Sequence, residues 1–151
     1  MDKPVASSTA KKTLYRLFNT LTGEHFFTSN ESERNELLKD SRWSDEGQGW
    51  TSPEVSDFPI YRLVNPNNGD HHYTMDKNEY DILAQYGWQQ EGIGLYSADS
   101  NSEDIVQLHR LYNPNCKEAG SHQYTVSEEE RDNLVQQDWQ YEGIAWYGLK
   151  N

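Results

Sequence analysis

The sequence of 151 residues has one cysteine, no long apolar run and few basic residues. A single cysteine, Cys116, excludes an internal disulfide framework. No stretch approaches the roughly 18 consecutive apolar residues of a membrane-spanning helix, and the first residues lack the apolar run of a signal peptide. We therefore expect no membrane partner and a domain stabilised by its own core.

Basic residues are outnumbered, with 13 Lys and Arg against 25 Asp and Glu, and the formal net charge is −12. Such a charge repels phosphate before any specific contact forms, so nucleic acids and anionic surfaces are poor partners. The apolar fraction is also low, at 34%, but the chain holds ten Tyr, five Trp and four Phe. Each ring can bury about 150–250 Å², and we expect these rings to build the core of a single domain.

One motif occurs three times along the chain. Its opening is Tyr-Arg-Leu-Phe-Asn at residues 15–19, Tyr-Arg-Leu-Val-Asn at 61–65 and His-Arg-Leu-Tyr-Asn at 109–113. A His, an aromatic residue and a Thr follow in each copy, then a Trp and, three residues later, a Glu-Gly pair. The pattern predicts copy 1 at residues 14–51, copy 2 at 60–97 and copy 3 at 108–148, within one domain spanning 14–151. Residues 1–13, which have no periodicity, are predicted to be a linker.

Each copy is predicted to fold as a β-hairpin, a helix and a last strand. Asn and Gly in the segment after each opening favour a tight turn between two short strands. A capping residue followed three positions later by Glu then predicts the start of a helix with a capping box. These pairs are Asn30 with Glu33, Asp76 with Glu79, and Ser127 with Glu130.

A single copy has too little core to be stable alone, so the three copies must bury their aromatic faces against one another. We therefore expect an α+β fold of three ββαβ repeats in a closed, pseudo-threefold arrangement. The alternative is a β-trefoil, which also has three units of this length, although the repeated capping signals favour true helices.

The motifs are clearest in copy 3, with Arg-Leu-Tyr-Asn at 110–113, His-Gln-Tyr-Thr at 122–125 and Trp-Gln-Tyr-Glu-Gly at 139–143. This pattern resembles a tandem bacterial repeat family of unknown function, appended to secreted and phage cell-wall hydrolases and to surface proteins. The resemblance covers residues 14–148. It implies a module that anchors its parent protein to a cell wall or surface glycan, and it supplies no catalytic residues. Copy 1 departs most from the pattern, with Gln48 and Thr51 in place of Ile93 and Tyr96, and is the copy expected to have lost a site.

Two recurring sets of polar residues have competing interpretations. His25, His71 and His122 could meet at an axis and bind Zn²⁺, but a local backbone partner for each His is favoured, and we expect no metal or cofactor. Arg16, Arg62 and Arg110 recur together with Glu46, Glu91 and Glu142. Because a catalytic carboxylate is needed only once, this recurrence favours structural bridges between the first and last strands of each copy.

Aromatic rings remain as candidates for ligand contacts. The repeated Trp43, Trp88 and Trp139 are interpreted mainly as core residues, with sugar platforms as the alternative. Rings and amides that differ between copies or lie in turns are better candidates, because loops carry variable recognition on a fixed scaffold. The predicted ligand-binding residues are Asn67, Asn68, Asp70, Tyr86, Tyr141 and Trp146.

No nucleophile–base motif or phosphate loop is present, so the sequence favours a module without catalytic residues. We expect it to act at the cell surface or outside the cell, binding a bacterial cell-wall polymer or surface glycan for a catalytic domain in the same chain. A protein-binding adhesion module is the alternative, and a small hydrolase is a weaker one.

Overall fold

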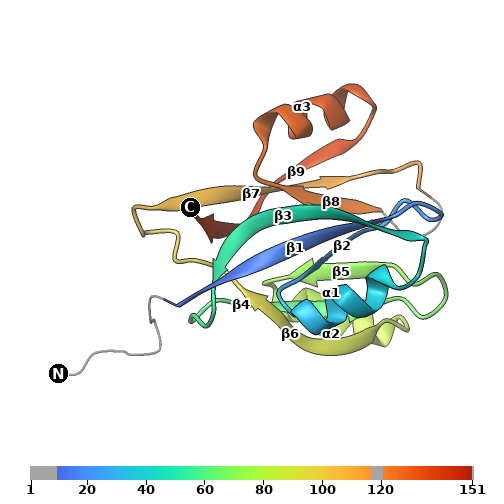
Figure 1. Ribbon diagram of the computed structural model, residues 1–151, viewed down its shortest axis with the longest axis horizontal. Helices are drawn as coiled ribbons and strands as arrows, with labels where there is room; N and C mark the ends of the chain where they lie inside the picture. Colours follow the sequence, from blue (N-terminus) through green and yellow to red (C-terminus); the bar gives the residue numbers. More distant parts are fainter. Residues whose placement is uncertain (1–9, 117–120, 151) are drawn as a thin grey trace.

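The computed structural model describes residues 10–116 and 121–150. These residues form nine strands and three helices, and the order strand, strand, helix, strand occurs three times (Figure 1). Copy 1 contains β1 (Lys11–Asn19), β2 (His25–Thr28), α1 (Glu31–Leu38) and β3 (Trp43–Pro53). Copy 2 contains β4 (Pro59–Val64), β5 (His71–Thr74), α2 (Lys77–Gln85) and β6 (Gln89–Tyr96). Copy 3 contains β7 (Ile105–Tyr112), β8 (His122–Thr125), α3 (Glu128–Gln136) and β9 (Gln140–Leu149).

The strands form two antiparallel sheets, and neither is closed. Copies 1 and 3 share a six-stranded sheet in the order β2-β1-β3-β9-β7-β8, whereas copy 2 forms its own sheet in the order β5-β4-β6. The shared sheet is joined at a single residue pair, Thr51 with Leu149. The expected α+β class is confirmed. The β-trefoil alternative does not describe this chain, because a helix follows each of the three hairpins.

Residues 1–9, which make up most of the expected linker, and residue 151 lie outside the described residues. Strand β1 begins at Lys11, because Lys11, Lys12 and Thr13 pair with the end of β3. Within the described part of the chain, no helix is long and apolar enough to cross a membrane.

The core consists of three sets of equivalent side chains, one member from each copy. Nine buried residues form it: Leu14, Ile60 and Leu108 from the first strands, Phe27, Tyr73 and Tyr124 from the second strands, and Trp50, Leu95 and Trp146 from the last strands. The rings of the second set touch one another edge to face, with centroids 5.7–5.9 Å apart. Each copy therefore contributes the same three positions to one core.

The helices lie at the surface and begin as the capping signals predict. The side chains of Asn30, Asp76 and Ser127 accept hydrogen bonds from backbone N–H groups in the first turn. Of all the described helical residues, only Tyr80 is buried. The capping-box expectation is wrong in its second half, because the N–H of each capping residue donates to the Thr two positions earlier and not to the Glu.

The repeated Trp residues are not the core residues that the spacing suggested. Trp43, Trp88 and Trp139 are half-buried, whereas Trp50 and Trp146 are buried. Each last strand has two register shifts around its Glu-Gly pair, where the glycine takes a left-handed φ, as at Gly47 with φ +83°. Each shift adds one residue, so the two together leave the alternation of faces unchanged. Trp43 and Trp50 are seven positions apart and therefore lie on opposite faces of β3, as do the equivalent pairs in copies 2 and 3.

Candidate binding site between the repeats

Each copy contacts the other two through an equivalent set of charged residues. The Nε atom of each first-strand Arg donates to the Glu of its own last strand, at 2.7 Å in all three copies. The pairs are Arg16 with Glu46, Arg62 with Glu91, and Arg110 with Glu142. The predicted structural bridges are thus confirmed, and they turn the rest of each guanidinium toward the neighbouring copy.

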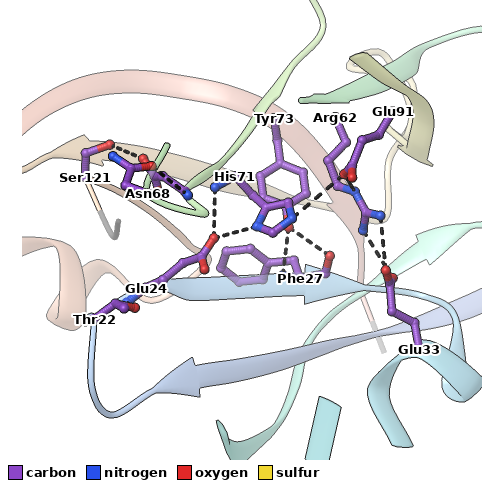
Figure 2. Close-up of polar contacts among 11 residues, drawn as sticks. Thr22, Glu24, Phe27, Glu33, Arg62, Asn68, His71, Tyr73, Glu91 and Ser121 are labelled. Atoms are coloured by element: carbon purple, nitrogen blue, oxygen red, sulfur yellow. Dashed lines mark hydrogen bonds and ion pairs between the residues drawn. The ribbon is translucent and has the colours of Figure 1, made fainter. Parts of the chain in front are cut away.

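The partner across each junction is the helix Glu for which the sequence predicts a role in a capping box. Arg62 makes a bidentate bridge to Glu33 of copy 1, with both distances 3.1 Å, as Figure 2 shows. Arg16 bridges Glu130 of copy 3 in the same way, at 3.0 and 2.7 Å. Sequence reasoning missed this role, although the recurrence of the Glu in all three copies was a signal for it.

The junction between copies 2 and 3 lacks this bidentate bridge. Arg110 Nη2 lies 3.7 Å from Glu79 Oε2, which is beyond hydrogen-bond distance. Glu79 Oε1 lies instead 3.3 Å from Nε2 of the buried His72. The pKa of Glu79 is lowered to about 2, first by His72 and further by Thr74 and Arg110, against the opposing effect of burial. In copies 1 and 3 the position of His72 holds Phe26 and Gln123.

A cavity of about 500 Å³ opens at this junction, and we call it the 2/3 groove. Copy 2 contributes the segment from Tyr73 to Asp76 together with Glu79. Copy 3 contributes Arg110, Glu142 and the segment from Ile144 to Trp146. Carboxylates and a guanidinium therefore lie beside the exposed apolar side chains of Met75 and Ile144.

A second cavity, of about 290 Å³, lies between copies 3 and 1. Its lining includes Val126 and the segment from Gln48 to Trp50, which are the positions equivalent to Met75 and to Ile144–Trp146 in the 2/3 groove. Here Glu130 bridges Arg16, and the remaining lining comes from Thr51, Val106, Leu149 and Lys150. This cavity is smaller and has no carboxylate in its lining.

The structure distributes the six predicted ligand residues over several places. Asn67 and Asn68 are exposed in the turn between β4 and β5, where they form part of a hydrogen-bonded turn. Tyr86 is 79% exposed at the C-cap of α2, and Tyr141 is partly exposed in β9, bonded to His109 at 2.8 Å. These four do not line the 2/3 groove.

The remaining two predicted residues are buried. Asp70 is 5% exposed and accepts a hydrogen bond from Ser121 at 2.8 Å. Trp146 is 1% exposed and stacks on Tyr124 in the core, so no face of its ring is open to a sugar. It does reach the inner wall of the 2/3 groove. Trp146 is not part of the repeated Trp set that is interpreted as core, but its ring points inward because it lies on the face of β9 opposite to the exposed Tyr141.

The three repeated histidines are not gathered at an axis. Each lies near the last-strand Glu of its own copy, with Nε2 to Oε1 distances of 4.0, 3.8 and 3.4 Å for His25, His71 and His122. His71 also bonds the buried Glu24 of copy 1, which Figure 2 shows, through Nδ1 at 2.7 Å. Burial raises the pKa of Glu24, while His71 lowers it. Within residues 10–116 and 121–150, no group of three potential ligands that could hold a metal ion is found.

One set of side chains has the order of a nucleophile and a base. Ser121 Oγ lies 3.2 Å from His122 Nδ1, and His122 Nε2 lies 3.4 Å from Glu142. Burial, with smaller effects of His72 and Arg110, lowers the pKa of His122 to about 3. A base with so low a pKa accepts a proton poorly at neutral pH. Ser121 Oγ moreover donates its hydrogen bond to Asp70.

Comparisons with known proteins give a match to one family model. No curated protein matches this chain, and no solved structure does. A family model described as a domain of unknown function matches residues 13–149, which is nearly all of the region with the three copies. The chain therefore belongs to the family described as "Domain of unknown function (DUF5648)".

Proposed function

We propose that this chain is a non-catalytic module that binds a neutral glycan in the 2/3 groove. The observation that carries the proposal is the lining of the groove. Carboxylates of Asp76, Glu79 and Glu142 accept hydrogen bonds, and the guanidinium of Arg110 donates them, beside the apolar Met75 and Ile144. Sugar hydroxyls both donate and accept, and the C–H face of a sugar ring packs on apolar side chains.

The charge of the molecule supports a neutral ligand. The groove places three carboxylates around a single guanidinium, and the whole chain has a formal net charge of −12. An anionic polymer is repelled at long range by such a surface, whereas a neutral polysaccharide is not. We propose that the natural target is a polymer of a bacterial cell wall or surface glycan. The module would then act outside the cell and direct a parent hydrolase or surface protein to it.

The experiment is co-sedimentation with purified bacterial cell walls, combined with an array of neutral and acidic glycans. Ile144→Glu places a charge in the groove, where Ile144 is 42% exposed, and it should weaken binding by about tenfold or more. The matched control is Ile93→Glu, because Ile93 is the equivalent residue of copy 2, is 49% exposed and does not line the groove. Equal binding by both variants, or no retention on any wall or glycan, would overturn the proposal.

A protein-binding adhesion module is the second candidate. The outer face of α2 exposes two apolar side chains, Ile82 at 50% and Tyr86 at 79%, which a polypeptide partner could cover. Protease treatment of the target surface separates the two candidates, because only a protein receptor is destroyed. Loss of binding after that treatment, with Ile82→Glu more harmful than Ile144→Glu, would favour the second.

We also infer that the three copies are arranged around a pseudo-threefold axis. The support is that the same positions contact one another across successive junctions, in the Arg–Glu bridges and in the triplet of second-strand rings. A chain of three identical copies of residues 108–148, joined by the native linkers, tests this arrangement. A folded monomer with one set of backbone NMR resonances per repeat is expected, and a chain that fails to fold or that oligomerises contradicts it.

A further inference from the structure

The three junctions between copies are built from equivalent residues, so their contacts can be compared position by position. At two of them, the first-strand Arg is held by three charged hydrogen bonds: one to Glu of its own copy through Nε, and the two of a bidentate bridge to the helix Glu of the preceding copy. At the third, Arg110 keeps the contact to Glu142. Among the described residues, its terminal nitrogens make no hydrogen bond, and the nearest carboxylate contact is 3.7 Å away.

The residue that distinguishes this junction is His72. Where the equivalent side chain is Phe26 or Gln123, the helix Glu bridges the arginine. Phe26 lies under Arg62, whose guanidinium carbon is 5.1 Å from the ring centroid. Gln123 Nε2 donates to Glu130 at 3.3 Å while Glu130 keeps its bridge to Arg16. His72 instead lies between the helix and the next copy, with Glu79 on one side and His122 on the other at a ring distance of 4.9 Å.

We propose that His72 is a positioning residue that makes the 2/3 groove a binding site. Glu79 Oε1 approaches His72 Nε2 to 3.3 Å without hydrogen-bond geometry, and Glu79 Oε2 stays 3.7 Å from Arg110 Nη2. The terminal N–H groups of Arg110 are thereby left to donate to the oxygens of a sugar. This inference rests on the proposed function for the identity of the ligand, and it names the specificity element of that site: two adjacent acceptor oxygens, the arrangement that a planar guanidinium recognises. Adjacent ring hydroxyls supply that pair in a neutral glycan.

A test that needs no glycan uses an arginine-selective dicarbonyl reagent on the intact protein. Modification of Arg16, Arg62 and Arg110 is followed by peptide mass spectrometry. In the wild-type chain, Arg110 should react about tenfold faster than the other two, because its terminal nitrogens are free. Equal rates at all three arginines would overturn the proposal.

The variants place at position 72 the residues that copies 1 and 3 have at the equivalent position. His72→Gln introduces the residue found in copy 3, so Glu79 should bridge Arg110 and slow its modification to the rate of Arg62. The double variant His72→Gln/Glu79→Gln removes the bridging carboxylate and should restore the fast rate. His72→Phe, with the residue of copy 1, serves if the first variant does not fold, and the rates at Arg16 and Arg62 report on folding in every sample. A rate at Arg110 that His72→Gln or His72→Phe leaves unchanged contradicts the proposal.

Introducing a His at the equivalent position of copy 3 should raise the reactivity of an arginine instead of lowering it. Gln123→His should draw Glu130 toward the new imidazole and make Arg16 reactive, in a junction where the wild-type arginine is protected. An unchanged rate at Arg16 in the folded variant contradicts the positioning role.

Binding to soluble fragments of bacterial cell-wall glycan is the second experiment. The His72→Gln variant should bind these fragments about tenfold more weakly than the wild-type chain, and the double variant should regain part of that loss. If the reagent rates behave as expected but no fragment binds to the wild-type chain, the proposed function fails and the positioning role stands.

Discussion

The hydroxyl of Tyr73 lies 3.0 Å from both the backbone nitrogen and the backbone oxygen of Phe27. Copy 2 thus completes the outer edge of β2 in copy 1 with a side chain instead of a strand. Tyr124 repeats half of the arrangement, because its hydroxyl donates to the Tyr73 carbonyl at 3.1 Å. All of these groups are buried, so the tyrosines satisfy edge groups that water cannot reach.

We predict that Tyr73→Phe destabilises the protein more than Tyr124→Phe. The first substitution leaves a buried N–H and a buried C=O without the hydroxyl, and it should lower the free energy of unfolding by about 2–4 kcal/mol. The second removes one bond and should lower it by about 1–2 kcal/mol. Urea unfolding with an unchanged m-value measures both. Equal losses in the two variants would show that the edge of β2 does not need the hydroxyl.

The three arginines should separate stability from binding. Arg16→Ala and Arg62→Ala each break a bidentate, partly buried bridge, and each should cost about 2–3 kcal/mol of unfolding free energy. Arg110→Ala breaks a weaker set of contacts and should cost about 1 kcal/mol, while abolishing retention on cell walls. Chemical denaturation and co-sedimentation on the same three variants provide the check. A larger stability loss for Arg110→Ala than for Arg62→Ala would contradict the geometry of the junctions.

Stability should fall as the pH is lowered from 6.5 towards 4. Burial, with a smaller effect of Arg16, lowers the pKa of His25 to about 4, and burial lowers that of His122 to about 3. The unfolded chain takes up protons at these residues near pH 6.5, whereas the folded chain does not. Their contribution is therefore complete above pH 6.5 and is lost on acidification, by up to about 1.4 kcal/mol per pH unit for each His. Glu24, whose pKa is raised by burial, acts in the opposite sense.

Urea midpoints measured between pH 7 and pH 4 test this dependence. The variant His122→Gln should show a shallower slope against pH, whatever its midpoint at pH 7. Below pH 4.5 a further loss of stability is expected, because the unfolded chain then takes up protons at Glu79 and Glu130. In the folded chain the pKa of each is about 2, so both stay ionised. A wild-type stability that is flat from pH 7 to pH 4 would show that neither His is held neutral.

Gly148 should not tolerate a side chain, although its backbone angles are ordinary. A Cβ there would lie 2.9 Å from Trp50 Cδ1 and 3.0 Å from the Thr51 carbonyl, at the point where β3 meets β9. We expect Gly148→Ala to lose about 1–3 kcal/mol through overpacking. Gly49→Ala is the matched control, because a Cβ there meets nothing closer than 3.6 Å. Equal midpoints in thermal or urea unfolding would argue against a tight contact at this position.

The order of elements and the bridges within each copy could be predicted from the repeated residues. Capping residues such as Asn30 and Ser127 signal a helix through local chemistry, and the recurring Arg–Glu pairs lie on adjacent strands of one copy. The groove could not be predicted in this way. It depends on Glu79 and Arg110, which belong to different copies, and on one deviation from the repeat, His72, which acts only where two folded copies meet.

The predicted ligand residues follow from the expectation that exposed turns and non-repeated rings carry recognition. Tyr86 and Tyr141 are indeed exposed, but Trp146 is buried because it lies on the face of β9 opposite to Tyr141, which is the face that packs on the core. Alternation counted along β9 places these two rings on opposite faces, but it does not show which face packs on the core. Met75 and Ile144, by contrast, are ordinary apolar residues whose exposure beside a cavity is a property of the packed copies.

The contact between the first and last copies has a kinetic consequence. Arg16 and Glu130 are separated by 114 residues, and β3 finds its partner β9 only near the other end of the repeats. Until copy 3 is made and folded, Trp50 lacks its contact with Trp146, and β3 lacks its pairing with β9 at Thr51. Contacts of such long sequence separation form slowly, so a nascent or truncated chain that ends after copy 2 should be the form most prone to aggregate, and the complete chain should fold in one cooperative step.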